Sequence, residues 1–138
     1  QRTELDMPTK PLSILLCSGN HEKIQMAAMM ASIAAVSDRR ASIFVSMNAI
    51  YSFLAQPASS ERYSGDEFSK LMLQKGVPDA IDLFKQGKEL GELSIFVCSM
   101  ALDVTEFDTD DMIPGLFDDV IGLTKFLSDA EEAQLVVI

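Results

Sequence analysis

Short runs of almost uninterrupted apolar residues, separated by helical patterns, constrain the fold of this chain more than any other feature. Residues 12–17, 41–45 and 93–97 form three such runs, and residues 134–138 form a fourth. Runs of this length are typical of strands that are buried on both faces of a parallel sheet. Residues 116–120 predict a further short strand, so we expect five strands in all.

Helical spacing of apolar residues fills the stretches between these runs. In residues 21–36 the apolar side chains recur every three to four positions, and Asn20 is a suitable N-cap. We expect the alanines of this helix, together with Met26, Met29 and Met30, to pack closely on the sheet rather than to form a Met-rich binding groove.

The other expected helices are shorter. A helix near the end of the chain is predicted to have one apolar face, formed by Leu123, Phe126, Leu127 and Ala130. The remaining expected helical segments are residues 46–54, 67–74, 78–90 and 99–104.

Strands that alternate with helices predict a three-layer α/β/α sandwich around a mostly parallel five-stranded sheet, because right-handed crossovers place helices on both faces. At 138 residues the chain has the size of one domain. We expect a single domain over residues 1–138, with residues 1–10 as an N-terminal extension. Residues 56–66 are rich in Pro, Ser and Gly and predict a loop, either a mobile cover over the carboxyl ends of the strands or a passive surface loop.

The formal net charge of −10 disfavours nucleic acid and anionic membranes as partners, because Lys and Arg supply most of the affinity for both. Two cysteines and one histidine are too few for a tetrahedral structural zinc site, so we expect no metal. No apolar run approaches the roughly 20 residues that cross a bilayer, and the first ten residues lack the apolar stretch of a secretion signal. We therefore expect a cytoplasmic protein without a transmembrane segment.

Motifs for phosphate and dinucleotide binding are missing. The first predicted strand is followed by one glycine, Gly19, where GxGxxG or a P-loop requires several. Two strand ends carry Cys17 and Cys98, where a phosphoacceptor receiver domain would need acidic residues. We therefore expect no cofactor.

Cys98 is the best candidate for chemistry. It directly follows the run at residues 93–97, and ligands of parallel α/β sheets bind outside the carboxyl ends of the strands. If residues 99–102 are helical, their N–H groups point at the sulfur and stabilise its thiolate, which is the nucleophilic form. Cys17 also ends a strand, but we interpret it as a buried structural residue.

Residues 96–104, FVCSMALDV, resemble the C-x-M-x-(M/L)-D segment of the DsrE/DsrF-like sulfur-trafficking family. The order and length of the predicted elements resemble that family over nearly the whole chain. The resemblance implies that Cys98 is the sulfur-carrying residue, with Met100, Leu102 and Asp103 as matching neighbours. Many members have a second cysteine nearby, whereas residues 99–138 contain none, which favours a single-cysteine carrier. The resemblance also implies a homo-oligomer, often a trimer or hexamer.

We therefore expect an intracellular sulfur carrier or sulfurtransferase-like protein. Cys98 would hold sulfane sulfur as a persulfide or thiosulfonate for relay to a partner thiol, which needs no cofactor. The expected partners are sulfur-donor and sulfur-acceptor proteins or small sulfane-sulfur species. The alternative is a noncatalytic binding or scaffold domain in which Cys98 is structural, and the accessibility of this thiol in the folded protein distinguishes the two.

The expected site extends beyond the cysteine to residues at two strand ends. Those at the end of the first strand have backbone N–H groups at a helix start, which favour an anionic sulfur species. The expected binding residues are Ser18, Gly19, Asn20, Ser99, Met100 and Asp103.

Overall fold

A five-stranded parallel sheet is the centre of the computed structural model, which describes residues 9–56 and 61–138. The strands follow the order β4-β3-β2-β1-β5, and each neighbouring pair is parallel. The expected sheet is therefore confirmed and is parallel throughout. Its strands are β1 (Leu12–Leu16), β2 (Ala41–Val45), β3 (Leu93–Cys98), β4 (Asp119–Ile121) and β5 (Gln134–Val137).

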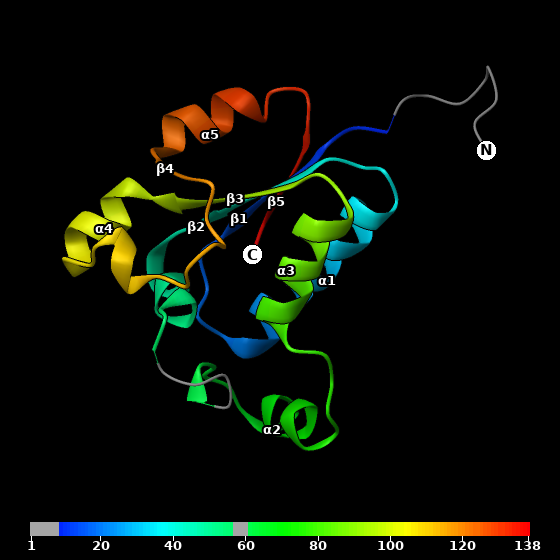
Figure 1. The fold of residues 1–138 in the computed structure, drawn as a ribbon, viewed down its shortest axis with the longest axis vertical. Helices are drawn as coiled ribbons and strands as arrows, with labels where there is room; N and C mark the ends of the chain where they lie inside the picture. Colours follow the sequence, from blue (N-terminus) through cyan, green and yellow to red (C-terminus); the bar gives the residue numbers. More distant parts are fainter. Residues whose placement is uncertain (1–8, 57–60) are drawn as a thin grey trace.

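Helices cover both faces of this sheet, which confirms the three-layer arrangement. Helices α1 and α3 lie on one face, α5 lies on the other, and α2 stands away from the sheet (Figure 1). The helices are α1 (His21–Val36), α2 (Glu67–Gln74), α3 (Ala80–Leu90), α4 (Ser99–Thr105) and α5 (Leu123–Asp129), with 3-10 helices η1 (Met47–Phe53) and η3 (Thr109–Asp111).

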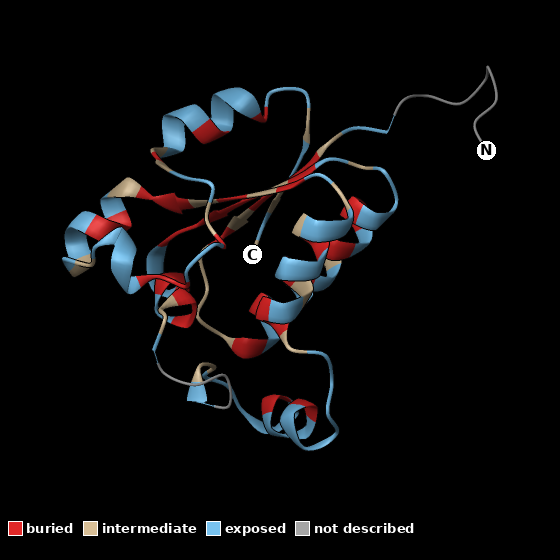
Figure 2. Ribbon diagram, in the orientation of Figure 1, coloured by how far each residue is buried: buried red, intermediate tan, exposed pale blue. Residues whose placement is uncertain are grey.

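The side chains of the strands alternate between the two faces. Ile14, Ile43 and Ile95 occupy one row of the register, and all three are fully buried. On the opposite face, Phe44 and Phe96 lie against Phe126 of α5. The centroid of the Phe126 ring is 5.2 Å from that of Phe44 and 6.4 Å from that of Phe96. Strands β1, β2 and β3 are mostly buried, whereas the edge strands β4 and β5 are more exposed (Figure 2). Burial on both faces explains why the three central strands are almost uninterrupted apolar runs.

Helix α1 is apolar on both sides, and this corrects one expectation. Ala27, Ala28 and Ala31 are fully buried, whereas Met26 and Met29 are exposed to solvent. Small side chains let the helix approach the sheet and α3 closely, so the long methionine side chains are left on the outer side. The prediction of close packing was therefore wrong for Met26 and Met29, whereas Met30 is partly buried and packs against the core.

Strand β4 and helix α5 also differ from the sequence prediction. The short strand β4 begins at Asp119 rather than at residue 116, and Leu116 is fully buried in the preceding connection. In α5, Phe126 is buried whereas Leu123 and Leu127 are exposed, so the predicted apolar face is only half buried. A single short helix meets the sheet along one line, which leaves its flanking side chains in solvent.

Some expectations fall partly outside the described residues. Of the expected N-terminal extension, residues 1–8 lie outside, and so do residues 57–60 of the expected loop. In the described part of the chain, none of the helices has the length and apolar content needed to span a bilayer.

Candidate functional site

Both cysteines lie at the carboxyl edge of the sheet. Leu16 of β1 and its partners in β2 and β3 form the last shared row of the register, so Cys17, Ser46 and Cys98 follow in the next row. The ladder continues into this row, because the Ser46 N–H donates to the Leu16 carbonyl over 3.0 Å. The strand ends therefore bring together two thiols that are 81 positions apart in the chain.

The two thiols share a face of the sheet. Phe44 and Phe96 point toward α5, and side chains two residues further along a strand return to the same face. Cys98 follows Phe96 by two residues, and Cys17 follows Leu15, the register partner of Phe44, by two. Both cysteines are therefore placed on the α5 side of the sheet.

The cysteines are too far apart for a direct disulfide. They end strands separated by β2, so their Cα atoms are about two strand spacings, or roughly 9.6 Å, apart. A disulfide requires Cα atoms within about 7 Å. Both thiols are free. Burial raises the pKa of Cys17, and a negative charge on nearby Cys98 raises it further, so Cys17 is a neutral thiol at physiological pH.

The exposure of the two cysteines is the reverse of the sequence expectation. Cys98 is 3% exposed and belongs to the hydrophobic core, whereas Cys17 is half-buried. The reason is the element that follows each strand. Helix α4 begins at Ser99 without any intervening loop, and Cys98 is also paired with Ile121 of β4. Cys17 is followed instead by a short polar connection to α1.

Helix α4 carries the other residues expected beside Cys98. Ser99 is half-buried, while Met100 and Asp103 are exposed on the outside of the helix. In the described structure the Cys98 side chain receives no capping hydrogen bond from the N–H groups of α4. The expectation that these N–H groups stabilise the sulfur is therefore not met in this conformation.

The residues expected at the end of β1 line a polar cavity of about 360 Å³. The Asn20 carboxamide accepts hydrogen bonds from the N–H groups of Glu22 and Lys23, so it caps α1. A Cβ on Gly19 would come within 2.5 Å of Asn48 Nδ2 and 3.0 Å of the Asn48 carbonyl oxygen, so a side chain at this position would force Asn48 to shift. The residues lining the cavity are Ser18, Gly19, Asn20, Asn48, Ser64, Gly65 and Asp66.

The structure thus divides the expected site into two parts. Ser18, Gly19 and Asn20 lie together at the cavity, but neither Cys98 nor any residue of α4 lines it. Sequence reasoning missed Asn48 and the segment 64–66. The length of the loop at residues 56–66 was one available signal. The last residues of this loop fold back over the start of α1, where the His21 N–H donates to the Ser64 carbonyl over 2.8 Å.

A buried polar cluster adjoins this cavity. His21 Nδ1 lies 2.6 Å from the Ser69 hydroxyl, and the His21 ring stacks on Tyr63 at a centroid distance of 4.2 Å. The Tyr63 hydroxyl donates to Asp79 over 2.7 Å. Burial lowers the pKa of His21, although the carboxylates of Asp79 and Glu22 oppose this. Burial also raises the pKa of Tyr63, together with its hydrogen bond to Asp79. Both rings are therefore neutral at physiological pH.

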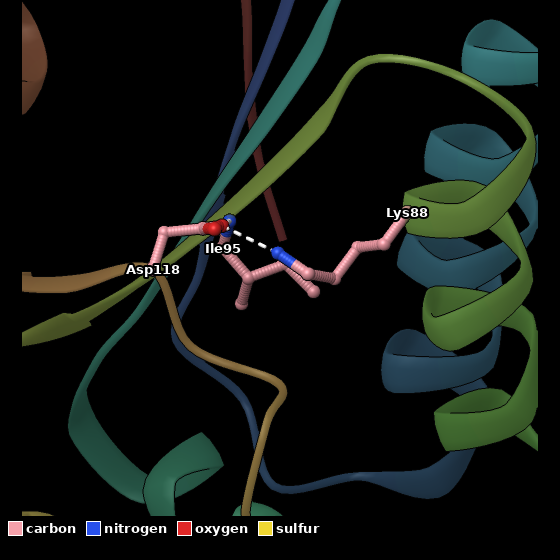
Figure 3. Close-up of polar contacts among 3 residues, drawn as sticks. All are labelled: Lys88, Ile95 and Asp118. Carbon is pink, nitrogen blue, oxygen red and sulfur yellow. Dashed lines mark hydrogen bonds and ion pairs between the residues drawn. The ribbon is translucent and has the colours of Figure 1, made fainter.

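A larger hollow of about 510 Å³ lies beside the connection into β4. Asp118 is one of its lining residues, and its carboxylate accepts hydrogen bonds from Lys88 Nζ over 2.6 Å and from the Ile95 N–H over 2.8 Å (Figure 3). These contacts join the connection to β3 and α3. Neither cysteine lines this hollow, so we interpret Asp118 as a structural residue.

Comparisons with known proteins agree with this fold. The model of the DsrE/DsrF/DrsH-like family matches residues 59–138, which is more than half of the chain and includes Cys98 but not Cys17. A solved structure of a protein of unknown function, MTH1491 from Methanobacterium thermoautotrophicum, is similar with a TM-score of 0.62 and 13% sequence identity. The similarity covers 94% of this chain and 99% of that chain. None of the curated protein sequences matches the chain.

Proposed function

The chain belongs to the DsrE/DsrF/DrsH-like family, and from this premise we propose that it is a sulfur carrier whose Cys98 holds sulfane sulfur for a partner thiol. The observation that carries the proposal is the position of Cys98. It lies at the carboxyl end of an interior strand and inside the part of the chain that the family model matches. Ligands of parallel α/β sheets bind at this edge.

The proposed chemistry needs only thiolates and sulfane sulfur. The Cys98 thiolate attacks the outer sulfur of a persulfide or polysulfide donor, so that a new S–S bond forms on Cys98. The S–S bond of the donor breaks, and the donor leaves as a thiolate with the electron pair. Unloading is the same exchange with an acceptor thiolate, which takes the outer sulfur and releases Cys98 as a thiolate. Loading and unloading balance without an external oxidant or reductant.

Access to Cys98 requires a local movement, because the side chain is only 3% exposed. Helix α4 follows it directly in the chain and has seven residues. Only Ala101 and Leu102 of this helix are buried, so few side chains hold it in place. Short elements with few buried apolar contacts open at low free-energy cost. We infer that α4 opens to load Cys98 and closes over the persulfide, which shields it from water.

The proposed carrier works in the cytoplasm, where thiols are kept reduced. Its proposed partners are sulfur-donor and sulfur-acceptor proteins or small sulfane-sulfur species. We further propose that it is a homo-oligomer, either a trimer or a hexamer. Ser18, Gly19 and Asn20 remain proposed as a binding site for a small anion, although Asp66 lies in the same cavity and opposes negative charge.

A noncatalytic scaffold domain is the second candidate function. The observation that favours it is the burial of Cys98 in the hydrophobic core, where a cysteine packs as a small apolar residue. A scaffold of this kind would bind a partner through its surface and would not take up sulfur.

Intact-protein mass spectrometry after incubation with inorganic polysulfide tests the proposed function. We expect the wild-type protein and Cys17→Ser to gain the mass of one or more sulfur atoms, and a reducing thiol to remove it. Cys98→Ser is the matched variant and should gain nothing. An adduct that survives in Cys98→Ser, or that is lost only in Cys17→Ser, would contradict the assignment of the carrier residue.

A further inference from the structure

Ser46 lies between the two cysteines in the row that follows the last shared row of the sheet. The register of β1, β2 and β3 continues into this row, where Ser46 has Cys17 as one neighbour and Cys98 as the other. The Cα atoms of neighbouring strands lie roughly 4.8 Å apart. Ser46 is therefore a direct neighbour of both thiols.

The Ser46 side chain lies on the same face of the sheet as both thiols. Phe44 of β2 packs against Phe126 of α5, and Ser46 follows Phe44 by two residues. The backbone of Ser46 is extended, with φ −143° and ψ 177°, so the alternation of side chains continues to this residue. The same alternation places Cys17 and Cys98 on the α5 side. On this face the row therefore presents a thiol, a hydroxyl and a second thiol.

The Ser46 hydroxyl is not used by the local fold. Ser46 is the N-cap residue of η1, where a serine hydroxyl ordinarily accepts a hydrogen bond from the helix, yet its side chain makes no capping bond. The residue is only 4% exposed, and its hydroxyl makes no other hydrogen bond within the described part of the chain. No fully enclosed side-chain oxygen of the described residues lacks a partner, so this oxygen keeps some contact with solvent. The hydroxyl is therefore free to turn toward a neighbouring thiol.

A serine hydroxyl can accept a hydrogen bond from one neighbour and donate one to the other. Burial raises the pKa of Cys17, so this thiol keeps its proton and is the donor. The charge of Cys98 adds to that rise, which places the two thiols within electrostatic reach of each other. Hydrogen bonds to a charged acceptor are the strongest, so the Ser46 hydroxyl gains most by donating to the Cys98 thiolate.

We propose that Ser46 donates a hydrogen bond to the Cys98 thiolate and that the Cys17 thiol holds the Ser46 hydroxyl in this direction. The proposal rests on the proposed function, because it gives Ser46 a part in the reactions of Cys98. The hydrogen bond stabilises the thiolate that attacks the sulfur donor. It also stabilises Cys98 as the leaving thiolate when an acceptor takes the outer sulfur. Ser46 keeps its proton throughout, so the bonds that form and break are the S–S bonds of the exchange alone.

The pH dependence of Cys98 alkylation tests the proposal. Initial rates with iodoacetamide are followed by site-resolved mass spectrometry in the full chain. In Ser46→Ala the pH of half-maximal rate at Cys98 should rise by about one unit, because the thiolate loses a hydrogen bond to a charged group. This pH does not change when a variant only alters how often α4 opens, whereas the absolute rate does.

Two further variants serve as controls. Ser46→Thr retains the hydroxyl and should keep the wild-type pH of half-maximal rate. Ser42→Ala removes a hydroxyl from the same strand and the same face four residues earlier, and it should also leave this pH unchanged. The other titratable side chains of η1, α4, β4 and α5 are exposed and are identical in all these proteins, so they do not produce a difference. They are Tyr51, Asp103, Asp119, Lys125 and Asp129.

Release of sulfur provides a second readout. After loading with inorganic polysulfide, Ser46→Ala should lose its added mass to 2-mercaptoethanol several-fold more slowly than the wild type, because Cys98 leaves as a less stabilised thiolate.

The outcomes separate this proposal from the proposed function. An unchanged pH of half-maximal rate in Ser46→Ala, or a shift that Ser42→Ala reproduces or Ser46→Thr does not reverse, would overturn the role of Ser46 alone. A wild-type chain that takes up no sulfur would overturn the proposed function, whatever the alkylation profile shows.

Discussion

The ends of β1 and β3 each carry a cysteine at the same edge of the sheet, but the structure holds them in different ways. After β1, polar contacts dominate, because Asn20 caps α1 and Ser64 of the returning loop pairs with Asn20. After β3, the chain enters α4 directly, and Cys98 makes no capping hydrogen bond among the described residues. One end is held by hydrogen bonds and the other by apolar packing.

This difference shows how position and environment separate two similar residues. The half-buried thiol, Cys17, lies at the polar strand end and has a raised pKa. The deeply buried thiol, Cys98, directly precedes a short helix that few buried side chains hold. The proposed function therefore predicts that exposure in a single conformation is a poor guide to which cysteine reacts, and the free energy of opening each strand end is the quantity to measure.

The largest expected effect is on thiol alkylation. In Cys17→Ser, native burial should slow iodoacetamide modification of Cys98 on the order of a thousand-fold relative to the urea-unfolded chain. In Cys98→Ser, modification of Cys17 should be slowed far less, because this thiol is half-buried. If α4 opens locally, the Cys98 rate should stay nearly constant in low urea, since little surface is exposed. A rate that rises with the full urea dependence of global unfolding would favour the scaffold function.

The next effect concerns the tight contact at the end of β1. Gly19→Ala should lower the free energy of unfolding by about 2 kcal/mol, because the added Cβ would lie 2.5 Å from Asn48 Nδ2. Gly122 provides the matched control, since it also joins a strand to a helix but its Cβ would meet nothing closer than 3.8 Å. Urea unfolding measures both variants. Equal losses in the two would show that the contact with Asn48 is not responsible.

The polar cluster beside β1 should make stability depend on pH. Burial lowers the pKa of His21 in the folded state, so the unfolded state binds a proton at higher pH. Stability is therefore complete above the unfolded pKa of about 6.5 and falls as the pH drops below it, by at most about 1.4 kcal/mol per pH unit. His21 is the single histidine of the chain. Urea unfolding between pH 7.5 and 5.5 should show this slope in the wild type, and a similar slope in His21→Gln would contradict its origin.

The smallest effect concerns the interaction between the two thiols. Burial and the charge of Cys98 both raise the pKa of Cys17, so its alkylation rate should still increase above pH 8.5. Cys98→Ser removes the charge of Cys98 but leaves the burial of Cys17 unchanged. The pH midpoint of Cys17 alkylation should therefore shift slightly toward lower pH and should stay above that of a free thiol. Site-resolved mass spectrometry over pH 7 to 10.5 measures the midpoint in both proteins. An unchanged midpoint would mean that the charge of Cys98 does not affect the pKa of Cys17.

Much of the fold was predictable from local pattern. The bounds of α1, β2 and α2 agree with the apolar periodicity, the N-cap at Asn20 and the stop at Gly76, whose φ is +69°. Of the candidate site, the sequence placed Cys98 at a strand end, and the structure agrees. The other residues of the candidate site were harder to predict. Ser18, Gly19 and Asn20 line a cavity with Asn48 and residues 64–66 of a distant loop, not with residues of α4.

The sequence by itself determined the order of strands and helices, because residue size, apolarity and capping act over a few neighbouring positions. Tertiary structure decided which residues are buried. Met26 and Met29 are exposed because small alanines fill the contact between α1 and the sheet. Cys98 is buried because it pairs with Ile121 of β4 and packs within the hydrophobic core. Burial depends on contacts between segments far apart in the chain, and a local pattern carries no information about which segment will cover a given side chain.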